Sequence, residues 1–544
     1  MSKRLINSQV RVLIVDNEER TVELYKEFLN LWGYSFVVAE GAGEALLDDA
    51  KRKAKEYRCH IALVDMRLKD DFDEEDISGL NLIKEIKPTE AIIISGYKTL
   101  ELVLKIVKDR VASDFFDKGA NPEILKEKID EVITEKWRFH KEILIEPAHI
   151  LQDIEETKNI SSIPQQFHDQ IYDILIRLFP KAKKLRLEKM NSFPEALNYS
   201  TVPRPGSVIL RVYEDELQPV ILKIARSQKI HKEIENFNKY ISGRLKGNYK
   251  PTLEGYATLW DIGGIKLSHV DSVEGTFANF IFKQPVDKIE NSLRHFFLEA
   301  WSPHYKNVLY TSNTSLFSLY RGVWGEKWLE KANVCSMPTP LGMMGEKIWQ
   351  EVRTNNNPLD FLKKMIENEG TENDPSLVKE TQEAITHGDL HADNLLIDGG
   401  QHGWVIDFER TGWGHVLQDF VELDADIIVR STCAREEFPD FYHFSLAITT
   451  ENPIEEISSI NSSLGDDDET RKTLSIISTI RNLALQSANT NDFRQYLLGL
   501  YFNIIFRATL DKNEEKRKHN KCELRTWMLA SILSRRIIHW DDED

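Results

Sequence analysis

The sequence predicts a chain with two folded parts: an open α/β sheet at the N-terminal end, then an α+β unit of two lobes with a helical C-terminal lobe. Apolar, strand-like runs alternate with helical patterns from residue 10 to residue 118, which is typical of an α/β sheet. Further strand-like runs lie between residues 185 and 225, and the residues from 419 onward show helical patterns. The length of 544 residues is too great for one hydrophobic core, so several domains are expected.

The N-terminal pattern contains five strand-like runs. They are residues 10–15, 35–39, 60–65, 91–96 and 113–118. The first is almost continuously apolar, as expected of a parallel strand that is buried on both faces. The alternation with helices predicts a five-stranded parallel sheet with right-handed crossovers, whose ligand site lies at the carboxyl ends of the strands.

Polar residues stand at these strand ends: Asp16, Asp65, Ser95 and Lys118. In type and order they resemble the site of the flavodoxin-like receiver domain of two-component response regulators. The resemblance implies that Asp16 and Asp65 bind Mg²⁺ and that Asp65 accepts a phosphoryl group. It also implies that Lys118 pairs with the phosphate, that Ser95 is the switch hydroxyl and that Phe115 is the switch aromatic residue.

Two positions depart from the receiver pattern. Asn17 follows Asp16 where the family has a second carboxylate, so weaker attraction of Mg²⁺ is expected. Gly119 follows Lys118 where a proline is common. An acidic run, residues 69–76, lies between Asp65 and the next helix; we interpret it as a solvated loop, the alternative being a surface that recruits metal or a partner.

Strand-like runs at 185–190, 207–213 and 219–225 predict the small lobe of the second part. Lys223 is the charged residue in an otherwise apolar strand, which is unusual for a routine edge position. This strand resembles the Val-Ala-Ile-Lys strand of kinases, and the resemblance implies that Lys223 pairs with a Glu of the helical run that follows, Glu233 or Glu235, with Glu233 favoured. In a kinase-like small lobe the Gly206-Ser207 turn would cover the ATP phosphates, but by itself it is typical of an ordinary hairpin turn.

The most informative stretch reads Thr-His-Gly-Asp-Leu-His-Ala-Asp-Asn-Leu-Leu-Ile at residues 386–397. Phosphoryl transfer needs a carboxylate near the acceptor hydroxyl and oxygen ligands for Mg²⁺, and Asp389 and Asn394 provide one of each. Asp407, at the end of a second apolar strand, stands where a further metal-binding carboxylate belongs.

The His-Gly-Asp-x-His-x-x-Asn motif resembles the aminoglycoside phosphotransferase and choline kinase branch of the protein-kinase-like fold. The resemblance implies that Asp389 is catalytic, that Asn394 and Asp407 bind Mg²⁺, and that Lys223, held by Glu233, positions ATP together with Gly206 and Ser207. His387 and Asp419 are then structural. Within this superfamily, the arrangement is similar to the kinase-related ternary-complex-associated domains.

We divide the chain into a receiver domain (1–135), a helical connector (136–180), a kinase-like N-lobe (181–270) and a kinase-like C-lobe (271–544) with an aromatic-rich insert and a helical C-terminus. The aromatic residues of the insert have nearly helical spacing, which favours core packing over a ligand cage. A substrate-specificity element is the alternative.

Composition limits the location and the partners. Seventy Lys and Arg against 88 Asp and Glu give a net charge of −18, which disfavours nucleic acid and anionic membranes as partners. No stretch has the apolar length of a membrane span. The four cysteines are far apart without Cys-x-x-Cys spacing, so neither a zinc site nor a disulfide framework is expected, and a cytoplasmic location fits.

Together the two resemblances imply a bacterial-type two-component signalling protein. Phosphorelay to Asp65 would regulate a phosphotransferase that uses ATP and Mg²⁺ and acts on a hydroxyl acceptor. The expected partners are a sensor histidine kinase or another phosphodonor and a hydroxyl-bearing small molecule or protein; a homo-oligomer is left open. The alternative function is a nucleotide-binding pseudokinase scaffold that signals by partner assembly, which the complete set of Lys223, Asp389, Asn394 and Asp407 disfavours.

Overall fold

The computed structural model divides the chain into two compact units. One comprises residues 1–189, 206–230 and 254–266, and the other comprises 190–205, 231–253 and 267–544. The structure describes residues 10–69, 73, 76–96, 112–137, 143–147, 149–150, 167–189, 207–245, 251–268, 273–325, 328, 357–435, 441–450, 467–488, 492–510 and 521–540.

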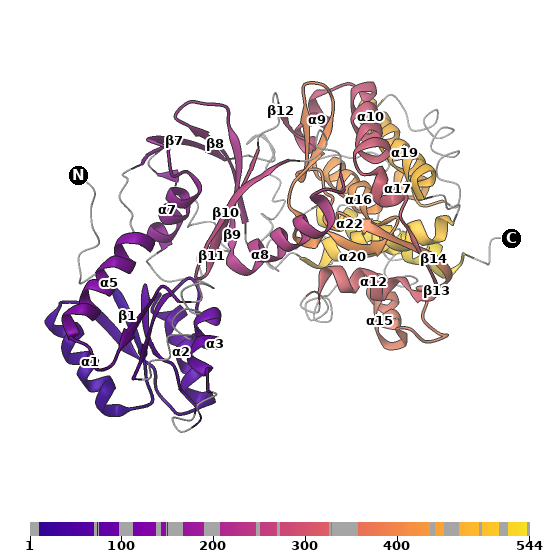
Figure 1. The fold of residues 1–544 in the computed structure, drawn as a ribbon. Helices are drawn as coiled ribbons and strands as arrows, with labels where there is room; N and C mark the ends of the chain where they lie inside the picture. The colour runs from indigo at the N-terminus through magenta and orange to yellow at the C-terminus, as the bar shows by residue number, and fades with distance from the viewer. Residues whose placement is uncertain are drawn as a thin grey trace. The chain divides into compact units, whose positions relative to one another are not determined.

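The first unit begins with a sheet of five parallel strands in the order β2-β1-β3-β4-β5 (Figure 1). The strands are β1 (Arg11–Val15), β2 (Ser35–Val38), β3 (Ile61–Asp65), β4 (Glu90–Ser95) and β5 (Asp114–Asp117). Order and direction are those of a doubly wound sheet, so the predicted fold class of this domain is confirmed. The strands are apolar because both faces are covered by helices.

Each face of this sheet has its own hydrophobic core. Helices α1 (Glu19–Leu31) and α5 (Pro122–Lys136) pack on one face, where Tyr25 and Ile129 are buried. Helices α2 (Glu44–Glu56) and α3 (Ser78–Glu85) cover the other face through residues such as Leu47 and Ile83. Asn121 accepts a hydrogen bond from the backbone of Glu123, which caps the start of α5.

The same unit contains a six-stranded sheet in the order β10-β11-β9-β8-β7-β6. Its strands are β6 (Leu144–Glu146), β7 (Lys184–Lys189), β8 (Ser207–Glu214), β9 (Val220–Arg226), β10 (Leu253–Leu259) and β11 (Ile262–Ser268). Helix α7 (Phe167–Leu178) lies between β6 and β7 in the chain, and Ile171 and Leu175 pack in the core of this sheet. The connector expected to be helical therefore also supplies a strand.

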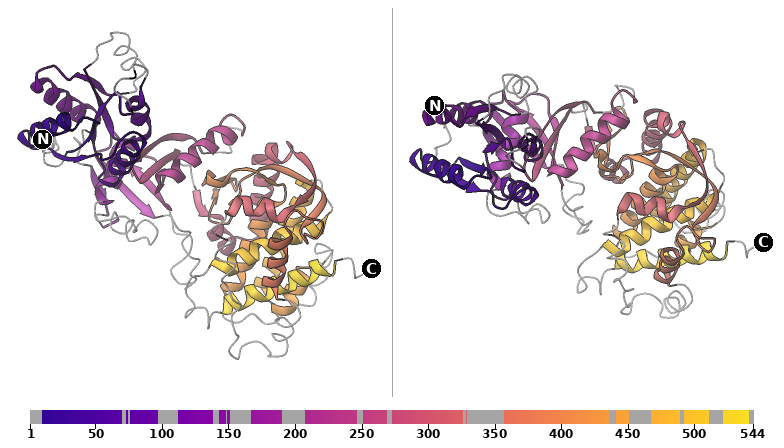
Figure 2. Two further views of the ribbon diagram at one scale, coloured as in Figure 1. Left: turned by 90° about the horizontal axis from the view of Figure 1, so that it is seen from below. Right: turned by 60° about the horizontal axis from the view of Figure 1, so that its bottom comes forward.

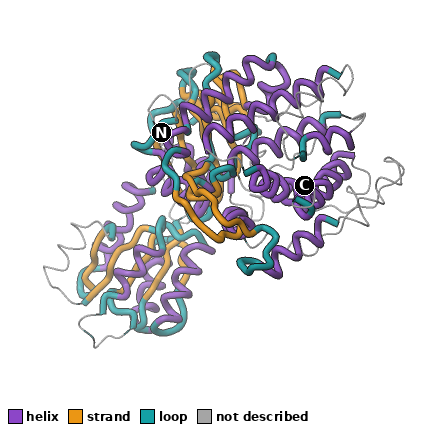
Figure 3. The backbone as a smooth tube through the Cα atoms, turned by 90° about the vertical axis from the view of Figure 1, so that its right-hand side faces the viewer, coloured by secondary structure: helices purple, strands orange, loops and turns teal. Residues whose placement is uncertain are grey.

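The second unit is mainly helical, as the purple helices of Figure 3 show. Its long helices are α16 (Gln418–Cys433), α19 (Asp468–Ala488), α20 (Phe493–Leu510) and α22 (Lys521–Ile538), which are seen from two further sides in Figure 2. Two small sheets carry the segments of interest. One contains β12 (Val273–Thr276), β15 (Leu395–Asp398) and β16 (Gly403–Val405), and the other contains β13 (Leu309–Ser315), β14 (Leu377–Thr386) and β17 (Gly412–His415). This helical lobe, with the antiparallel strands β7, β8 and β9 that precede it in the chain, agrees with the predicted α+β unit with a helical C-terminal lobe.

The aromatic residues of the insert mostly form core. Trp301, Tyr305, Phe317 and Tyr320 are all buried within one large hydrophobic cluster of the helical unit. Tyr310, by contrast, is 75% exposed on β13, and Trp349 lies outside the described residues. Among the described helices, none combines the length and the apolar character that crossing a membrane requires.

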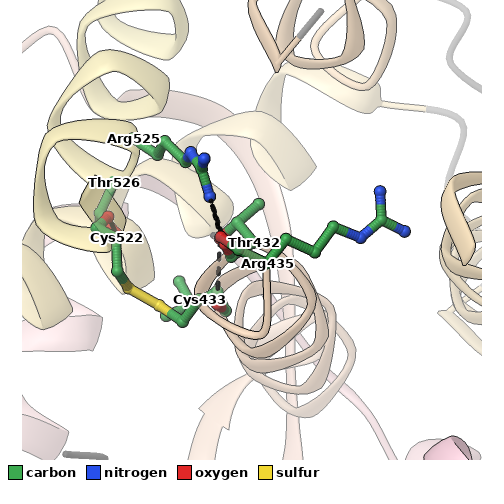
Figure 4. Close-up of a disulfide and its surroundings, with 7 residues drawn as sticks. Thr432, Cys433, Arg435, Cys522, Arg525 and Thr526 are labelled. Atoms are coloured by element: carbon green, nitrogen blue, oxygen red, sulfur yellow. Dashed lines mark hydrogen bonds between the residues drawn. A yellow bond between two sulfur atoms is a disulfide. The ribbon is translucent and has the colours of Figure 1, made fainter. Parts of the chain in front are cut away.

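Two cysteines depart from the prediction. Cys433 at the end of α16 and Cys522 at the start of α22 form a disulfide across 89 residues of sequence (Figure 4). Beside it, Arg525 donates hydrogen bonds to the backbone oxygens of Thr432 and Arg435. The expectation of no disulfide was wrong because the helix packing, which sequence spacing does not display, brings the two residues together.

Candidate functional site

The polar residues at the strand ends of the N-terminal sheet come together in one cluster. Asp16 follows β1, Asp65 ends β3, Ser95 ends β4 and Lys118 follows β5. The Lys118 ammonium lies 2.9 Å from an Asp16 oxygen and 3.2 Å from an Asp65 oxygen. The parallel order puts these ends at one edge of the sheet, so residues far apart in sequence share a site.

Burial shifts the pKa values of the carboxyl groups in this cluster. It raises the pKa of Asp65 from its ordinary 3.8 to about 6; the negative charge of Asp16 adds to this, and Lys118 opposes it. Burial also raises the pKa of Asp16, against the attraction of Lys118. The pKa of the Tyr25 hydroxyl is raised by burial and by both carboxylates. Two carboxylates beside one ammonium suit a divalent cation, because a cation would offset their repulsion.

The residues predicted to act as switch residues lie on β4 and β5. Ser95 is buried, and its backbone oxygen accepts a hydrogen bond of 3.1 Å from the Lys118 amide. Phe115 is half-buried on β5 against the core beneath α2 and α3. Asn17 is exposed, and residues 70–72, 74 and 75 of the acidic run lie outside the described residues.

Gly79 is a residue of this site that sequence reasoning missed. A Cβ atom there would lie 2.0 Å from the backbone oxygen of Asp65, and the Gly79 amide donates to the Met66 oxygen at 3.0 Å. Only glycine lets α3 approach the end of β3 so closely. Its place at the start of a helical pattern was visible in the sequence, but the close approach was not.

In the helical unit, Asp419 of α16 fixes the loop that contains Asp389. Its two carboxylate oxygens accept hydrogen bonds from the amides of His387 (2.8 Å) and Gly388 (3.0 Å), and Tyr305 donates at 2.9 Å. Burial raises the pKa of Asp419 to about 7, although these three donors oppose the rise. This geometry suits the bracing role that was expected of Asp419.

His387 and Gly388 allow the loop its shape. The His387 ring is fully buried, its Nε2 lies 3.0 Å from the Ile406 oxygen, and burial lowers its pKa to about 4, so the ring is neutral near pH 7. Gly388 has a φ of +76°, and a Cβ there would lie 2.5 Å from the Arg410 oxygen. Both positions are therefore packing positions beside Asp389.

The candidate catalytic and metal-binding residues lie on this loop and on the segment after it. Asn394 donates from its side-chain nitrogen to the Asp389 backbone oxygen at 2.8 Å, so its amide oxygen is the ligand it would offer a cation. The Asp389 carboxylate pairs with Arg410 at 3.2 Å, a residue that sequence reasoning did not single out. Asp407 adopts a left-handed φ of +73°, which is rare without glycine and concentrates at functional sites.

Helix α8 (Ser227–Asn236) is bound to the segment that follows Asp407. Glu233 is buried and accepts a hydrogen bond from the Phe408 amide at 3.2 Å, whereas Glu235 is exposed. Asn236 donates to the backbone oxygens of Phe408 (3.0 Å) and Glu409 (2.8 Å). This burial favours Glu233 over Glu235.

The remaining predicted nucleotide-binding residues lie in the first unit. Lys223 is buried on β9, and Ser207 begins β8 beside it in the sheet, whereas Gly206 lies outside the described residues. Lys223 and Glu233 belong to different compact units, so their pairing stays a prediction.

A second buried network that was not predicted supports the loop from its other side. Asp426 of α16 accepts a hydrogen bond from the Ala392 amide at 2.8 Å and pairs with Arg430 at 2.7 Å and Arg507 at 2.9 Å. Arg430 also bonds to Asp393. These charges hold the pKa of Asp426 well below its usual range, even though its burial opposes them.

Comparison with known proteins finds family models that match two parts of the chain. A family model of the response regulator receiver domain matches residues 12–130. The N-terminal part of this chain is a response regulator receiver domain. The model of ternary complex associated domain 9 matches residues 349–503, which contain Asp389, Asn394 and Asp407. No curated protein matches the chain.

Solved structures similar to the receiver domain include the chemotaxis protein CheY4 of Vibrio cholerae, at 21% identity over 23% of this chain and 98% of that chain, with a TM-score of 0.19. A response regulator of Burkholderia pseudomallei with a phosphorylated aspartic acid and a calcium ion is 19% identical over 28% of this chain and 86% of its own, with a TM-score of 0.19. A thermostable mutant of aminoglycoside phosphotransferase APH(4)-Ia is 12% identical over 68% of this chain and 99% of its own, with a TM-score of 0.35.

Proposed function

We propose that the chain is a two-component signalling protein in which phosphorylation of Asp65 regulates an ATP- and Mg²⁺-dependent phosphotransferase that acts on a hydroxyl acceptor. The observation that carries the proposal is the braced loop of the helical unit. The Asn394 side chain donates a hydrogen bond to the Asp389 backbone oxygen, and Asp419 fixes the loop backbone through two amide hydrogen bonds. Such preorganisation is what phosphoryl transfer asks of a protein.

Each residue would have a definite task in this reaction. Asp389 would orient the acceptor hydroxyl and take its proton, and Arg410, paired with Asp389 at 3.2 Å, would hold the carboxylate in place. Asn394 and Asp407 offer the oxygen ligands that Mg²⁺ prefers, and bound Mg²⁺ would neutralise charge on the ATP phosphates. Lys223, together with Ser207 and Gly206, would position the nucleotide.

In the receiver domain, Asp65 would accept the phosphoryl group from a histidine kinase or another phosphodonor. Asp16 and Asp65 fit a divalent cation, because they are buried carboxylates within reach of a single ammonium group. Lys118 would remain to pair with the new phosphate charge.

The test is transfer from γ-labelled ATP with Mg²⁺ in the full-length protein, supplied with candidate acceptors. Wild type is compared with Asp389→Asn, Asp407→Asn and a control, Asp398→Asn. Asp398 is a buried carboxylate that accepts hydrogen bonds from the Gly400 and His402 amides and from the Trp404 indole. Label transfer that both site variants abolish and the control retains supports the proposal. Nucleotide binding without transfer in wild type would favour the scaffold function instead.

Regulation is tested in the same assay by loading Asp65 with acetyl phosphate. A change in the transfer rate that is absent in Asp65→Asn supports control by the receiver domain. Equal rates with and without a loaded Asp65 would contradict it.

A further inference from the structure

The receiver domain packs against the hairpin turn between β10 and β11, within the first compact unit. The contact uses the edge of the receiver sheet where its strands begin, which is opposite to the edge that contains Asp65. His60 precedes β3, and its ring meets the rings of Trp137 and Trp260 at 5.0 Å and 6.0 Å between centroids. The two tryptophans stack at 5.3 Å and 11°.

Trp137 joins the two sheets of this unit. It caps the end of α5, a helix whose Ile129 is part of the receiver core. Yet Trp137 itself is buried in the core of the six-stranded sheet, in the same cluster as Ile171 and Leu187. Burying such a ring between two sheets removes a large apolar area from water, so the two sheets favour one arrangement.

Polar contacts fix the same interface. Lys55 of α2 pairs with Asp261 in the hairpin turn at 3.0 Å. Arg58 and the Leu259 backbone oxygen are bridged by Gln170 of α7 when its amide is oriented to suit these neighbours, at 2.8 Å and 3.2 Å. The receiver thus contacts both residues of the turn between the strands, Trp260 by stacking and Asp261 by charge.

The same turn holds the start of α8. The Ser227 hydroxyl donates to the Trp260 backbone oxygen at 2.7 Å, and the Ser227 amide donates to the Asp261 backbone oxygen at 2.9 Å. The receiver therefore contacts Trp260 and Asp261, and the backbone oxygens of the same two residues accept hydrogen bonds from Ser227, the first residue of α8.

Strand β11 presses on α8 as well. A Cβ atom at Gly263 would lie 2.9 Å from the Ile230 side chain of α8, and one at Gly264 would lie 2.8 Å from Ile174 of α7. The Gly-Gly pair lets the two helices approach β11 from either side, and Figure 1 shows β11 beside α8. A shift of the hairpin would therefore displace α8, since packed interiors leave little room for independent movement.

We propose that the hairpin turn at Trp260 and Asp261 is the docking surface through which the receiver domain controls α8, the helix that contains Glu233. The proposal rests on the proposed function, because α8 reaches the metal-binding segment through the Glu233 contact with the Phe408 amide. Strand β3 runs from Ile61, which follows His60 beside the turn, to Asp65, the proposed phosphorylation site. A change at one end of this strand is thereby passed to the turn and to α8.

The test measures amide hydrogen exchange of residues 227–236 in the full-length protein. Lys55 is 58% exposed, so Lys55→Glu leaves the fold intact while placing two negative charges together at the turn. We expect faster exchange in this segment by up to about five-fold, the limit for an exposed ion pair. The double variant Lys55→Glu with Asp261→Lys, which reverses the pair, should restore the wild-type rate.

Lys51→Glu is the matched control. Lys51 lies on the same helix but pairs with Glu85 at 2.7 Å, inside the receiver domain, so its reversal should leave residues 227–236 unchanged. Equal exchange in this segment for the Lys55 and Lys51 variants would overturn the docking proposal.

A second arm loads Asp65 with acetyl phosphate and Mg²⁺, with loading confirmed by intact mass. We expect exchange of residues 227–236 to change in wild type, to stay constant in Asp65→Asn, and to respond less in Lys55→Glu. A change confined to the receiver strands would refute the proposal. Because exchange needs no catalysis, this outcome is separate from the ATP assay: coupling without label transfer would refute the enzyme and retain the docking surface.

Discussion

Replacing Asp65 by asparagine should stabilise the receiver domain at neutral pH when Mg²⁺ is absent. The folded-state pKa of Asp65 is about 6, against 3.8 ordinarily, because the carboxyl is buried and faces the charge of Asp16. A raised pKa means that the folded domain binds the proton more tightly than the unfolded chain. The resulting stability is complete below about pH 4 and is lost as pH rises through about 6.

The size of this effect follows from the difference between the two pKa values. It corresponds to about 3 kcal/mol at most, since one pKa unit is worth about 1.4 kcal/mol. Asparagine keeps the shape of the side chain and removes the charge. Relative to wild type, Asp65→Asn should therefore gain up to about 3 kcal/mol between pH 4 and pH 7.

Native-state hydrogen exchange measures this difference in the full-length chain, through the opening free energies of amides in β1, β3 and β4. Asp49→Asn is a control of opposite sign. Burial acts to raise the pKa of Asp49, but hydrogen bonds from the Glu40 amide, Arg52 and Lys53 lower it to about 2. Wild type therefore gains stability as Asp49 ionises, and Asp49→Asn should become less stable than wild type as pH rises. Opening free energies that change with pH in the same way in wild type and Asp65→Asn would refute the reasoning. Equal stabilisation of wild type and Asp65→Asn by Mg²⁺ at pH 7 would refute it as well.

Three further predictions concern the helical unit. Gly388→Ala places a methyl group against the Arg410 backbone oxygen at a residue with positive φ, so label transfer should fall at least about 100-fold while circular dichroism shows that the fold persists. Activity near that of wild type would contradict the predicted loop geometry. Asp424→Asn leaves the charge of Arg481 without a carboxylate in a site where both side chains are 0% exposed, so the free energy of unfolding in urea should fall by about 3–5 kcal/mol. A fall of less than about 1 kcal/mol would show that the ion pair is dispensable. Cys433→Ser removes a disulfide across 89 residues, which should lower the free energy of unfolding by at most about 4–5 kcal/mol under non-reducing conditions. In the presence of a reductant the variant and wild type should be equally stable. An equal loss in both conditions would show that packing of the Cys433 side chain is responsible instead.

The receiver site was predictable because its chemistry lies at strand ends. Once the runs ending at Asp16 and Asp65 are recognised as parallel strands, geometry brings their last residues to one edge of the sheet. The proximity of Asp389 and Asn394 was predictable for a different reason: their spacing in the sequence is local, so no tertiary contact is needed to see it.

The supporting shell could not be predicted in the same way. Asp426 and Arg430 stand on α16 with ordinary helical spacing, and charged residues on a helix normally face solvent. Their burial depends on how α16 packs against α20 and the loop, which the sequence does not display. The pair of Cys433 and Cys522 has the same cause, since its two helix ends meet only after the bundle forms.

Helix α8 determines which step of the proposed reaction the receiver domain can control. Its first residue is bound by the hairpin turn, and its later residues, Glu233 and Asn236, are bound to the segment that follows Asp407. The loop of Asp389, in contrast, is fixed from α16 through Asp419, by hydrogen bonds that do not involve α8. Displacement of α8 would therefore disturb Asp407, the proposed metal ligand, while Asp389, the proposed catalytic residue, stays braced. Phosphorylation of Asp65 should then change the affinity for Mg²⁺ and ATP more than it changes the rate of the bound complex. The KM for ATP should therefore shift while kcat stays nearly constant. A change confined to kcat would place the control at the loop of Asp389 instead.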